Sequence, residues 1–192
     1  MNVVFCHYRY SAYVTQRERA LDAAISLLGT EGLRALTHRR IDQKAQLPPG
    51  STSNYFRTRD ALLTGVADSI LERELTGAGP AFAPSNAEEF LDGLVALIVR
   101  TTGDQRTLTT ARLVLFMEAS HHPVLRDALW RGRAAIAAAL EPVLRSLGAS
   151  DPHSAAAALM ACSEGLILHR IARHDDSDIR PVLELVVAAA LA

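Results

Sequence analysis

The sequence predicts an all-α protein, and three observations lead to this fold class. Apolar residues recur at spacings of three and four along most of the chain, which is the period of an amphipathic helix. No stretch alternates apolar and polar residues for long enough to indicate a strand. Hydrophobic residues make up 49% of the 192 residues, so the chain has enough apolar side chains to form a core.

Cap signals divide the first part of the chain into helices. Thr15 followed three residues later by Glu18 forms a capping box, which predicts a helix start, and Gly32 can end that helix. Two short helical segments, 37–45 and 49–55, follow with a three-residue separation, and a longer helix comes after them. This order predicts an N-terminal three-helix bundle.

The rest of the chain, after a stretch rich in Gly and Pro at 76–85, predicts a larger helical region. Asn86 and Asp151 can cap helix starts, and Pro123 suits a first helical turn. Gly148 can end the helix that Pro123 begins. The expected helices span 86–102, 104–121, 123–147, 151–174 and 177–192.

Composition excludes several classes of protein. Two cysteines, Cys6 and Cys162, can form neither a disulfide framework nor a four-cysteine zinc site. No apolar run reaches the length of about 18 residues that spans a membrane, and the first residues lack the basic region of a signal peptide. We therefore expect a cytoplasmic protein without cofactor or membrane partner. One lysine against nineteen arginines indicates a bacterial genome rich in G and C.

The net charge of −1 conceals an uneven distribution of charge along the chain. Residues 1–60 contain nine basic and five acidic residues, a charge of +4, whereas the remaining residues carry −5. This division predicts a basic head on an acidic body, with the head as the part that can meet nucleic acid.

The two short segments fit a helix-turn-helix, in which the second helix enters the major groove of DNA. Such a helix must be short, exposed and rich in small polar side chains, as residues 49–55 are. Ile41, Ala45 and Leu47 can pack the unit from inside. The alternative is an ordinary three-helix bundle with a solvated basic face, but the polar run contains too many poor helix formers for a purely structural helix.

Residues 37–63, THRRIDQKAQLPPGSTSNYFRTRDALL, resemble the signature of the TetR family of transcriptional regulators. The resembling residues are Gly32, Thr37, Ile41, Ala45, Gly50, Tyr55, Phe56, Arg59, Leu62 and Leu63. The resemblance covers the first third of the chain without insertion. It implies a DNA-binding domain over 15–60 and an all-helical ligand-binding and dimerisation domain over 61–192. Residues 1–14 lie outside the resemblance and are expected to form an unstructured leader, with an arm along DNA through Tyr8 and Arg9 as the alternative.

The resemblance also implies roles for single residues in the head. Those expected to contact phosphates are Thr37, Ser51, Tyr55 and Arg59, those expected to face bases are Thr52, Ser53 and Asn54, and Arg39 and Arg40 complete the DNA-binding set. Asp42 stands where the family usually has a small apolar residue, and Gln46 stands where it usually has a turn glycine. Ser53 replaces a frequent tyrosine.

Two strongly apolar helices of the body, of which the segment 155–168 is apolar almost all the way round, predict a homodimer. In the segment 155–168 small residues form a stripe that allows another helix to approach closely, and the last helix is too apolar for one chain to cover. The expected interface residues are Ala158, Cys162, Gly165, His169, Leu183, Val186 and Val187. The alternative is that both helices belong to the core of one protomer. A dimer would present two recognition helices about 34–36 Å apart and favour a palindromic operator.

The middle helices of the body contain apolar and aromatic residues that suit a ligand pocket. The candidates are Phe90, Leu94, Leu97, Leu113, Phe116, Met117, Trp130, Met160 and Glu164. Each of the apolar residues can also be plain core. Glu118 and Glu164 lie on apolar helices and could orient a polar or cationic ligand.

These patterns predict a non-enzymatic, DNA-binding repressor that a small-molecule effector releases from a palindromic operator. One alternative is a helical metal-binding protein or enzyme that uses Glu118, His121 and His122, although this group lacks the second carboxylate–histidine turn of di-iron bundles. A further alternative is a DNA-binding dimer regulated by a protein partner.

Overall fold

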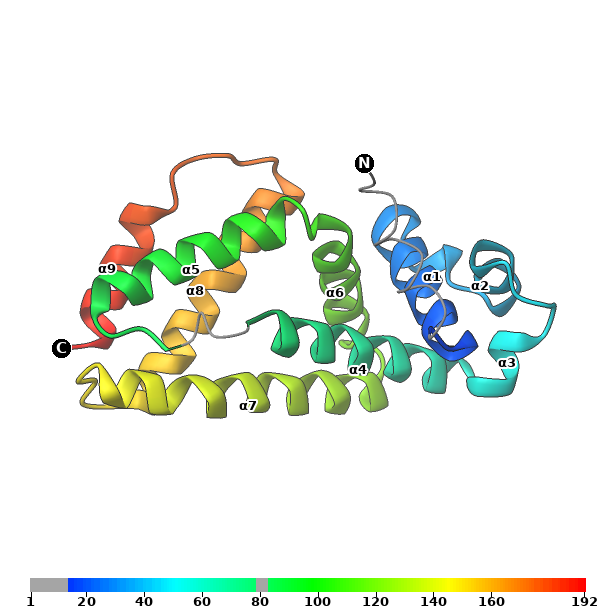
Figure 1. Ribbon diagram of the computed structural model, residues 1–192, viewed down its shortest axis with the longest axis horizontal. Helices are drawn as coiled ribbons and strands as arrows, with labels where there is room; N and C mark the ends of the chain where they lie inside the picture. Colours follow the sequence, from blue (N-terminus) through cyan, green and yellow to red (C-terminus); the bar gives the residue numbers. More distant parts are fainter. Residues whose placement is uncertain (1–13, 79–82) are drawn as a thin grey trace, which may run out of the picture.

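The computed structural model describes residues 14–78 and 83–192, and over these ranges the chain is helical and contains no strand. The expected leader falls almost entirely outside the described residues. The elements are α1 (Gln16–Glu31), a short 3-10 turn η1 (Leu33–Ala35), α2 (His38–Ala45), α3 (Ser51–Tyr55), α4 (Arg59–Ala78), α5 (Ala87–Thr102), α6 (Arg106–Glu118), α7 (Pro123–Ser146), α8 (Pro152–Ala172) and α9 (Arg180–Ala190). The prediction of an all-α fold is confirmed (Figure 1).

The helix ends follow the local signals in the sequence. Thr15 caps α1 through a complete capping box, in which the Glu18 carboxylate accepts a hydrogen bond from the backbone N–H of Thr15 at 2.7 Å. Asn86 caps α5, and Asp151 caps α8. Gly148, with a φ of 100°, follows the end of α7 in the left-handed region that favours glycine.

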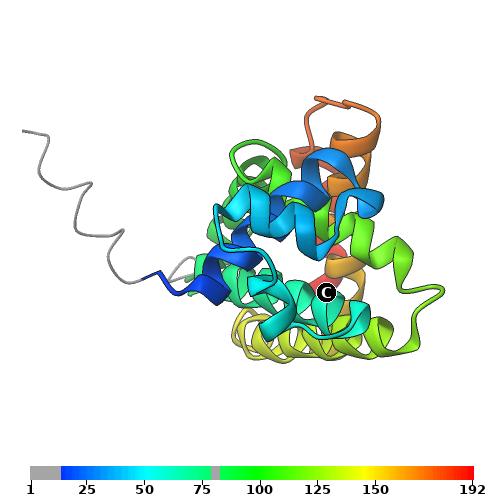
Figure 2. The ribbon, with the colours of Figure 1, turned by 90° about the vertical axis from the view of Figure 1, so that its right-hand side faces the viewer.

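The head lies at one end of the elongated molecule and contains α1, α2 and α3 (Figure 1). Figure 2 looks onto this end. Its core is formed by Leu21, Leu28 and Ile41, which are nearly inaccessible to solvent, and by apolar residues of α4 and α6. The head therefore shares a continuous core with the first helices of the body. The packing is not interrupted at residue 60, where the domain boundary is expected.

Close helix packing joins the head to the body. Helix α1 packs along α6, and α4 runs from the head into the body beside α7 (Figure 1). Gly29 lies at the crossing of α1 and α6, where a Cβ atom would be 2.1 Å from the carbonyl oxygen of Thr107. The absence of a side chain at Gly29 thus permits the two backbones to touch.

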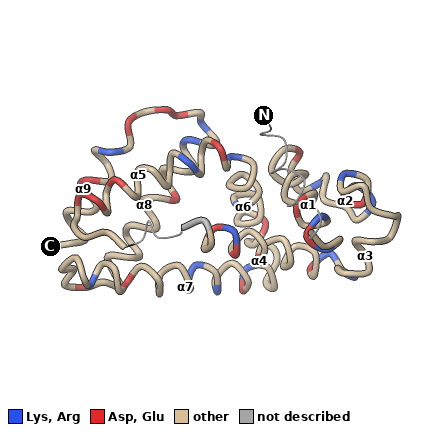
Figure 3. The backbone as a smooth tube through the Cα atoms, viewed as in Figure 1, with Lys and Arg blue, Asp and Glu red and all other residues tan. Residues whose placement is uncertain are grey.

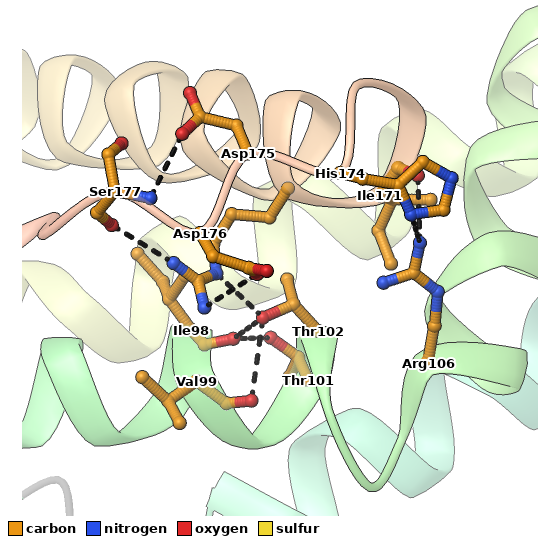
Figure 4. A network of polar contacts seen from close by, with 11 residues as sticks. Ile98, Val99, Thr101, Thr102, Arg106, Ile171, His174, Asp175, Asp176 and Ser177 are labelled. Atoms are coloured by element: carbon orange, nitrogen blue, oxygen red, sulfur yellow. Dashed lines mark hydrogen bonds and ion pairs between the residues drawn. The ribbon is translucent and has the colours of Figure 1, made fainter.

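A second hydrophobic core holds the far end of the body together. It is formed by α5, the end of α7, α8 and α9, with Ile98, Leu144 and Leu183 fully buried. Polar contacts fasten the connection between α8 and α9 to the α5–α6 corner (Figure 4). Arg170 donates to the Thr102 hydroxyl at 3.1 Å, and Arg106 donates to the carbonyl of Ile171 at 2.9 Å.

Candidate functional site

The recognition-helix candidate α3 is held at its N-terminus by a carboxylate from the preceding helix. Asp42 is buried and accepts hydrogen bonds from the N–H of Gly50 at 2.7 Å and the N–H of Thr52 at 2.8 Å. The Thr52 hydroxyl donates to the same carboxylate at 2.5 Å. Asp42 thus supplies acceptors to amides at the start of α3, where a helix has no internal partner for them.

The pKa of Asp42 reflects this arrangement. Burial acts to raise the pKa of the carboxyl group, but the hydrogen bonds from Thr52 and Gly50 outweigh burial and hold the pKa below its ordinary value. The carboxylate is therefore charged at neutral pH, and its charge lies at the positive end of α3.

The turn between α2 and α3 tolerates a residue other than glycine. Gln46 adopts the left-handed conformation, with a φ of 53° and a ψ of 44°, at the position where the family usually has glycine. Arg19 on α1 donates to the carbonyls of Ala45 and Gln46 at 2.6 and 3.2 Å. These bonds satisfy carbonyls at the end of α2 and fasten the turn to α1.

The C-terminal end of α3 is held from two sides. The Nε2 atom of His38 contacts the carbonyl oxygen of Phe56 at 2.6 Å and serves as the donor. The Phe56 ring is buried, and a Cβ atom at Gly65 would lie 2.4 Å from it, so α4 packs directly on the ring. The guanidinium of Arg17 lies over the Phe56 ring, 5.5 Å from its centre. With both ends fixed, α3 is rigidly mounted on the head.

The side chains around α3 form an exposed polar and basic surface. Asn54 and Tyr55 are exposed at the end of α3, and Tyr55 retains 45% of its accessible surface. Arg39, Lys44 and Arg57 are also exposed, and none of the three takes part in an ion pair within the described part of the chain. Basic positions lie along the segments around α2 and α3 (Figure 3). Uncompensated cations beside an exposed polar helix fit the charge and shape of a DNA groove.

A cavity of about 540 Å³ lies in the body between α4, α6, α7 and α8. This volume falls within the range of about 300–1,000 Å³ that is usual for small-molecule sites. Its walls are mainly apolar and include Ile70, Phe116, Trp130, Ile136 and Met160. Trp130 and Phe116 remain 70% and 52% exposed, so two aromatic rings of the wall stay uncovered by the protein itself.

Charged side chains from four helices meet at the same cavity. Arg112 contacts Glu74 at 2.9 Å and Glu164 at 3.6 Å, and Arg133 donates to Glu164 at 3.0 Å. Burial raises the pKa of Glu74, an effect that the charge of Arg112 opposes and that of Glu164 reinforces. The cavity therefore combines an apolar wall with a network of charges of low solvent exposure.

Comparison with known protein families matches residues 85–192 to the family described as "Tetracyclin repressor-like, C-terminal domain". The match covers more than half of the chain, and the head carries the family's helix-turn-helix signature. The chain belongs to the TetR family. TetR-family proteins are transcription regulators and not enzymes, as the sequence predicts.

Individual relatives agree with TetR-family membership. An uncharacterized HTH-type transcriptional regulator from the dhlA 5′ region of Xanthobacter autotrophicus is 41% identical over 59 residues, which are 31% of this chain and 29% of the relative. The chain thus matches less than a third of that relative's length.

Solved structures show the TetR-type fold over nearly the whole chain. A transcriptional regulator from Rhodococcus sp. Rha1 has a TM-score of 0.79 at 19% identity, with 92% of this chain and 96% of that chain covered. The multidrug binding protein EbrR in complex with ethidium has a TM-score of 0.75 at 24% identity, with 93% and 99% covered.

Among the sequence-predicted DNA-binding residues, three lie on the exposed surface with their own partners. Thr37 caps α2 by accepting from the N–H of Arg40 at 3.4 Å. Arg40 forms an ion pair with Glu31 at 2.6 Å, and Arg59 donates to the carbonyl of Leu36 at 3.4 Å. All three remain exposed enough to meet DNA, as do Arg39, Asn54 and Tyr55.

The hydroxyls of the other predicted DNA-binding residues are hydrogen-bonded within the head. Thr52 is fully buried against Asp42, and Ser51 is buried with its hydroxyl donating to the carbonyl of Pro48 at 2.7 Å. Ser53 is half-buried and donates to the carbonyl of Gly50 at 2.7 Å. Thr52 and Ser51 therefore hold α3 in place and lie beneath its outer surface, and the roles at DNA that the resemblance implies for them stay predictions.

The predicted pocket residues divide between the cavity and the core. Phe116, Trp130, Met160 and Glu164 line the cavity. The remaining candidates, Phe90, Leu94, Leu97, Leu113 and Met117, do not line it. Phe90 and Leu94 lie on the side of α5 that is buried in the second core. Met117 lies on a side of α6 that faces solvent, where it is 69% exposed.

Of the Glu118, His121 and His122 group, only Glu118 and His122 contact each other. His122 contacts Glu118 at 2.8 Å, one turn earlier, and lies 3.9 Å from Asp60 at the start of α4. His121 is exposed. Within residues 14–78 and 83–192 no group of three or more potential ligands is arranged to hold a metal ion. His122 thus links the α6–α7 turn to the start of α4.

The predicted dimer residues also fall on two sides of their helices. Leu183 and Val187 are buried in the second core, so they are not available to a partner, and Val186 is half-buried. Ala158, Cys162, Gly165 and His169 lie on the outer side of α8, each exposed or half-buried. Leu168, Val182 and Leu185 are further exposed apolar residues on α8 and α9.

Proposed function

We propose that the protein is a cytoplasmic transcriptional repressor that binds a palindromic operator as a homodimer and releases it when a small molecule occupies the cavity. The observation that carries this proposal is the rigidly mounted α3, which presents Asn54 and Tyr55 beside the exposed cations Arg39, Lys44 and Arg57. We assign Asn54 and Tyr55 to the groove and the cations to the phosphates.

The cavity supports control by an effector. The cavity has the volume and the apolar wall of a small-molecule site. The EbrR protein, which has the same fold, binds ethidium, and its complex favours an effector in the body for this chain as well. An effector releases DNA only if it binds more tightly to the state in which the two heads no longer fit the operator.

The outer faces of α8 and α9 support the homodimer. By length and composition alone, helix α8 is apolar enough to span a membrane, with a mean hydropathy of 1.3. Only 22% of its most apolar segment is buried within the protomer, so most of its apolar surface needs another partner. Its small outer residues, together with Leu168, Val182 and Leu185, would be covered by the same surface of a second copy. A helical dimer of this kind also places the two heads on one side of the assembly for a palindromic site.

DNA binding is tested with fluorescence anisotropy on DNA from around the gene's own promoter. Replacing Arg39 with alanine should weaken binding to all sequences alike and lower the slope of log K against log salt by about one unit, because one phosphate contact is lost. The matched control is Arg173→Ala, which removes an exposed arginine from the body. An unchanged slope for R39A, or an equal drop for R173A, contradicts the assignment.

The dimer interface is tested by sedimentation velocity. Leu185 is 74% exposed in the protomer, so Leu185→Glu should leave the protomer folded and shift the population from dimer to monomer by burying a charge in the interface. Val124→Glu, at an exposed apolar position on α7, is the control and should remain dimeric. If L185E sediments as the wild type does, this face of α9 is not the interface.

A further inference from the structure

The charges that line the cavity do not balance. The lining residues include three arginines, Arg112, Arg126 and Arg133, and two acids, Glu74 and Glu164. With all five groups ionised, the lining carries a net charge of +1. A cavity with apolar walls and one excess positive charge discriminates between ligands by the sign of their charge.

The excess charge can be assigned to one residue. Both carboxylates are already paired: Glu74 contacts Arg112 at 2.9 Å, and Glu164 contacts Arg133 at 3.0 Å and Arg112 at 3.6 Å. An added organic cation would have to displace an arginine from one of these pairs. Arg126, in contrast, forms no ion pair with any residue that the structure describes. Its guanidinium is the group of the lining that lacks a counter-charge.

The position of Arg126 complements the apolar part of the cavity. Arg126 and Trp130 are one turn apart on α7, so their side chains leave the same face of the helix. Trp130 and Phe116 offer exposed aromatic surface, and Met160 adds a flexible apolar side chain that adapts to the shape of a ligand. A ligand with one anionic end and one apolar end would satisfy both parts at once.

We propose that the effector cavity is selective for amphipathic monoanions, whose carboxylate binds Arg126 and whose apolar body packs on Trp130, Phe116 and Met160. This inference rests on the proposed function, since it names the class of effector. Burial also raises the pKa of Glu74, so any uptake of a proton by Glu74 adds to the positive charge of the lining. The assignment makes Arg126 the residue that determines specificity and Trp130 a reporter of binding.

The test compares three probes that share a ten-carbon chain: decanoate, decanol and decyltrimethylammonium, each below its micellar or solubility limit. Trp130 is the sole tryptophan of the chain, so its fluorescence reports binding to the full-length protein without DNA. We expect saturable binding of decanoate that is at least tenfold tighter than that of decyltrimethylammonium, with decanol between them. Absence of decanoate binding, or tighter binding of the cation, overturns the proposal.

Variants of α7 separate the role of Arg126 from a general effect of charge. Arg126→Gln should weaken decanoate binding roughly tenfold and leave decanol binding unchanged, because a charge-assisted hydrogen bond is lost. Arg126→Lys should restore part of the affinity. The control Arg131→Gln removes a neighbouring exposed arginine that does not line the cavity and should bind decanoate as the wild type does. Equal decanoate affinity of R126Q and R131Q overturns the assignment to Arg126.

Operator binding is measured separately by anisotropy, without any probe. A protein that binds decanoate through Arg126 but fails to bind DNA refutes the proposed repressor function and leaves the ligand class standing. A protein that binds DNA but prefers the cationic probe refutes the ligand class alone. The two proposals therefore fail in different measurements.

Discussion

Replacing Asp42 with alanine should abolish operator binding and lower the free energy of unfolding by about 3 kcal/mol or more, because each buried polar group left without a partner costs about 1–3 kcal/mol. The substitution leaves the N–H of Gly50, the N–H of Thr52 and the Thr52 hydroxyl without their acceptor inside the head. The start of α3 then loses the group that fixes its direction. Chemical denaturation and anisotropy on operator DNA measure the two effects.

The control for this prediction is Asp68→Ala, which removes an exposed carboxylate from α4 and should change neither stability nor DNA binding by much. The pH dependence adds a second readout. Because the pKa of Asp42 is lowered in the folded state, its contribution is fully present above the ordinary aspartate pKa of about 4 and is lost as the pH falls through the folded value. The wild type and D42A should therefore converge in stability on acidification. If the difference in free energy of unfolding between the wild type and D42A stays constant with pH, the Asp42 carboxylate does not cap α3.

Replacing Gly29 with alanine should destabilise the protein by about 3 kcal/mol, at the upper end of the usual range for overpacked sites. The new methyl group would lie 2.1 Å from the carbonyl oxygen of Thr107 and 2.9 Å from its carbonyl carbon. Both contacts are with backbone, so relief requires α1 and α6 to move apart. The same movement would loosen the head on the body.

The measurements for Gly29 are thermal and denaturant unfolding, with Thr30→Ala as the neighbouring control on the exposed side of α1. We expect T30A to unfold within about 0.5 kcal/mol of the wild type, as surface substitutions usually do. Wild-type stability of G29A would show that the helices do not cross as closely as the structure describes.

The sequence could predict the features that depend on neighbouring residues. The capping box at Thr15, the Asn86 cap and the position of α3 all rest on side chains within a few residues of each other, and the structure confirms the first two directly. Phe116 and Trp130 could be picked as pocket candidates because large aromatic residues are rare in this chain.

Features that depend on distant residues were beyond the sequence. The role of Asp42 could not be predicted, because its partners lie on the next helix and its type departs from the family pattern. The buried side of α9 was not predicted either: apolar residues lie on more than one face of the helix, so residue type alone does not distinguish Leu183, which faces the core, from Leu185, which faces outward. The charged network of the cavity joins Glu74, Arg112 and Glu164 from three helices.

Helix α4 connects the DNA-binding candidate surface with the cavity, since it begins at Arg59 beside α3 and contributes Glu74 to the cavity wall. A helix rises about 1.5 Å per residue, so about 22 Å of rod separate the two residues, and a tilt of roughly 5° about one end displaces the other by about 2 Å. In a two-fold dimer the displacements of both heads add, to about 4 Å against a groove spacing of 34–36 Å. In the repressor that we propose, α4 would thus act as a lever arm, which converts a small adjustment around a ligand into a mismatch of register with the DNA.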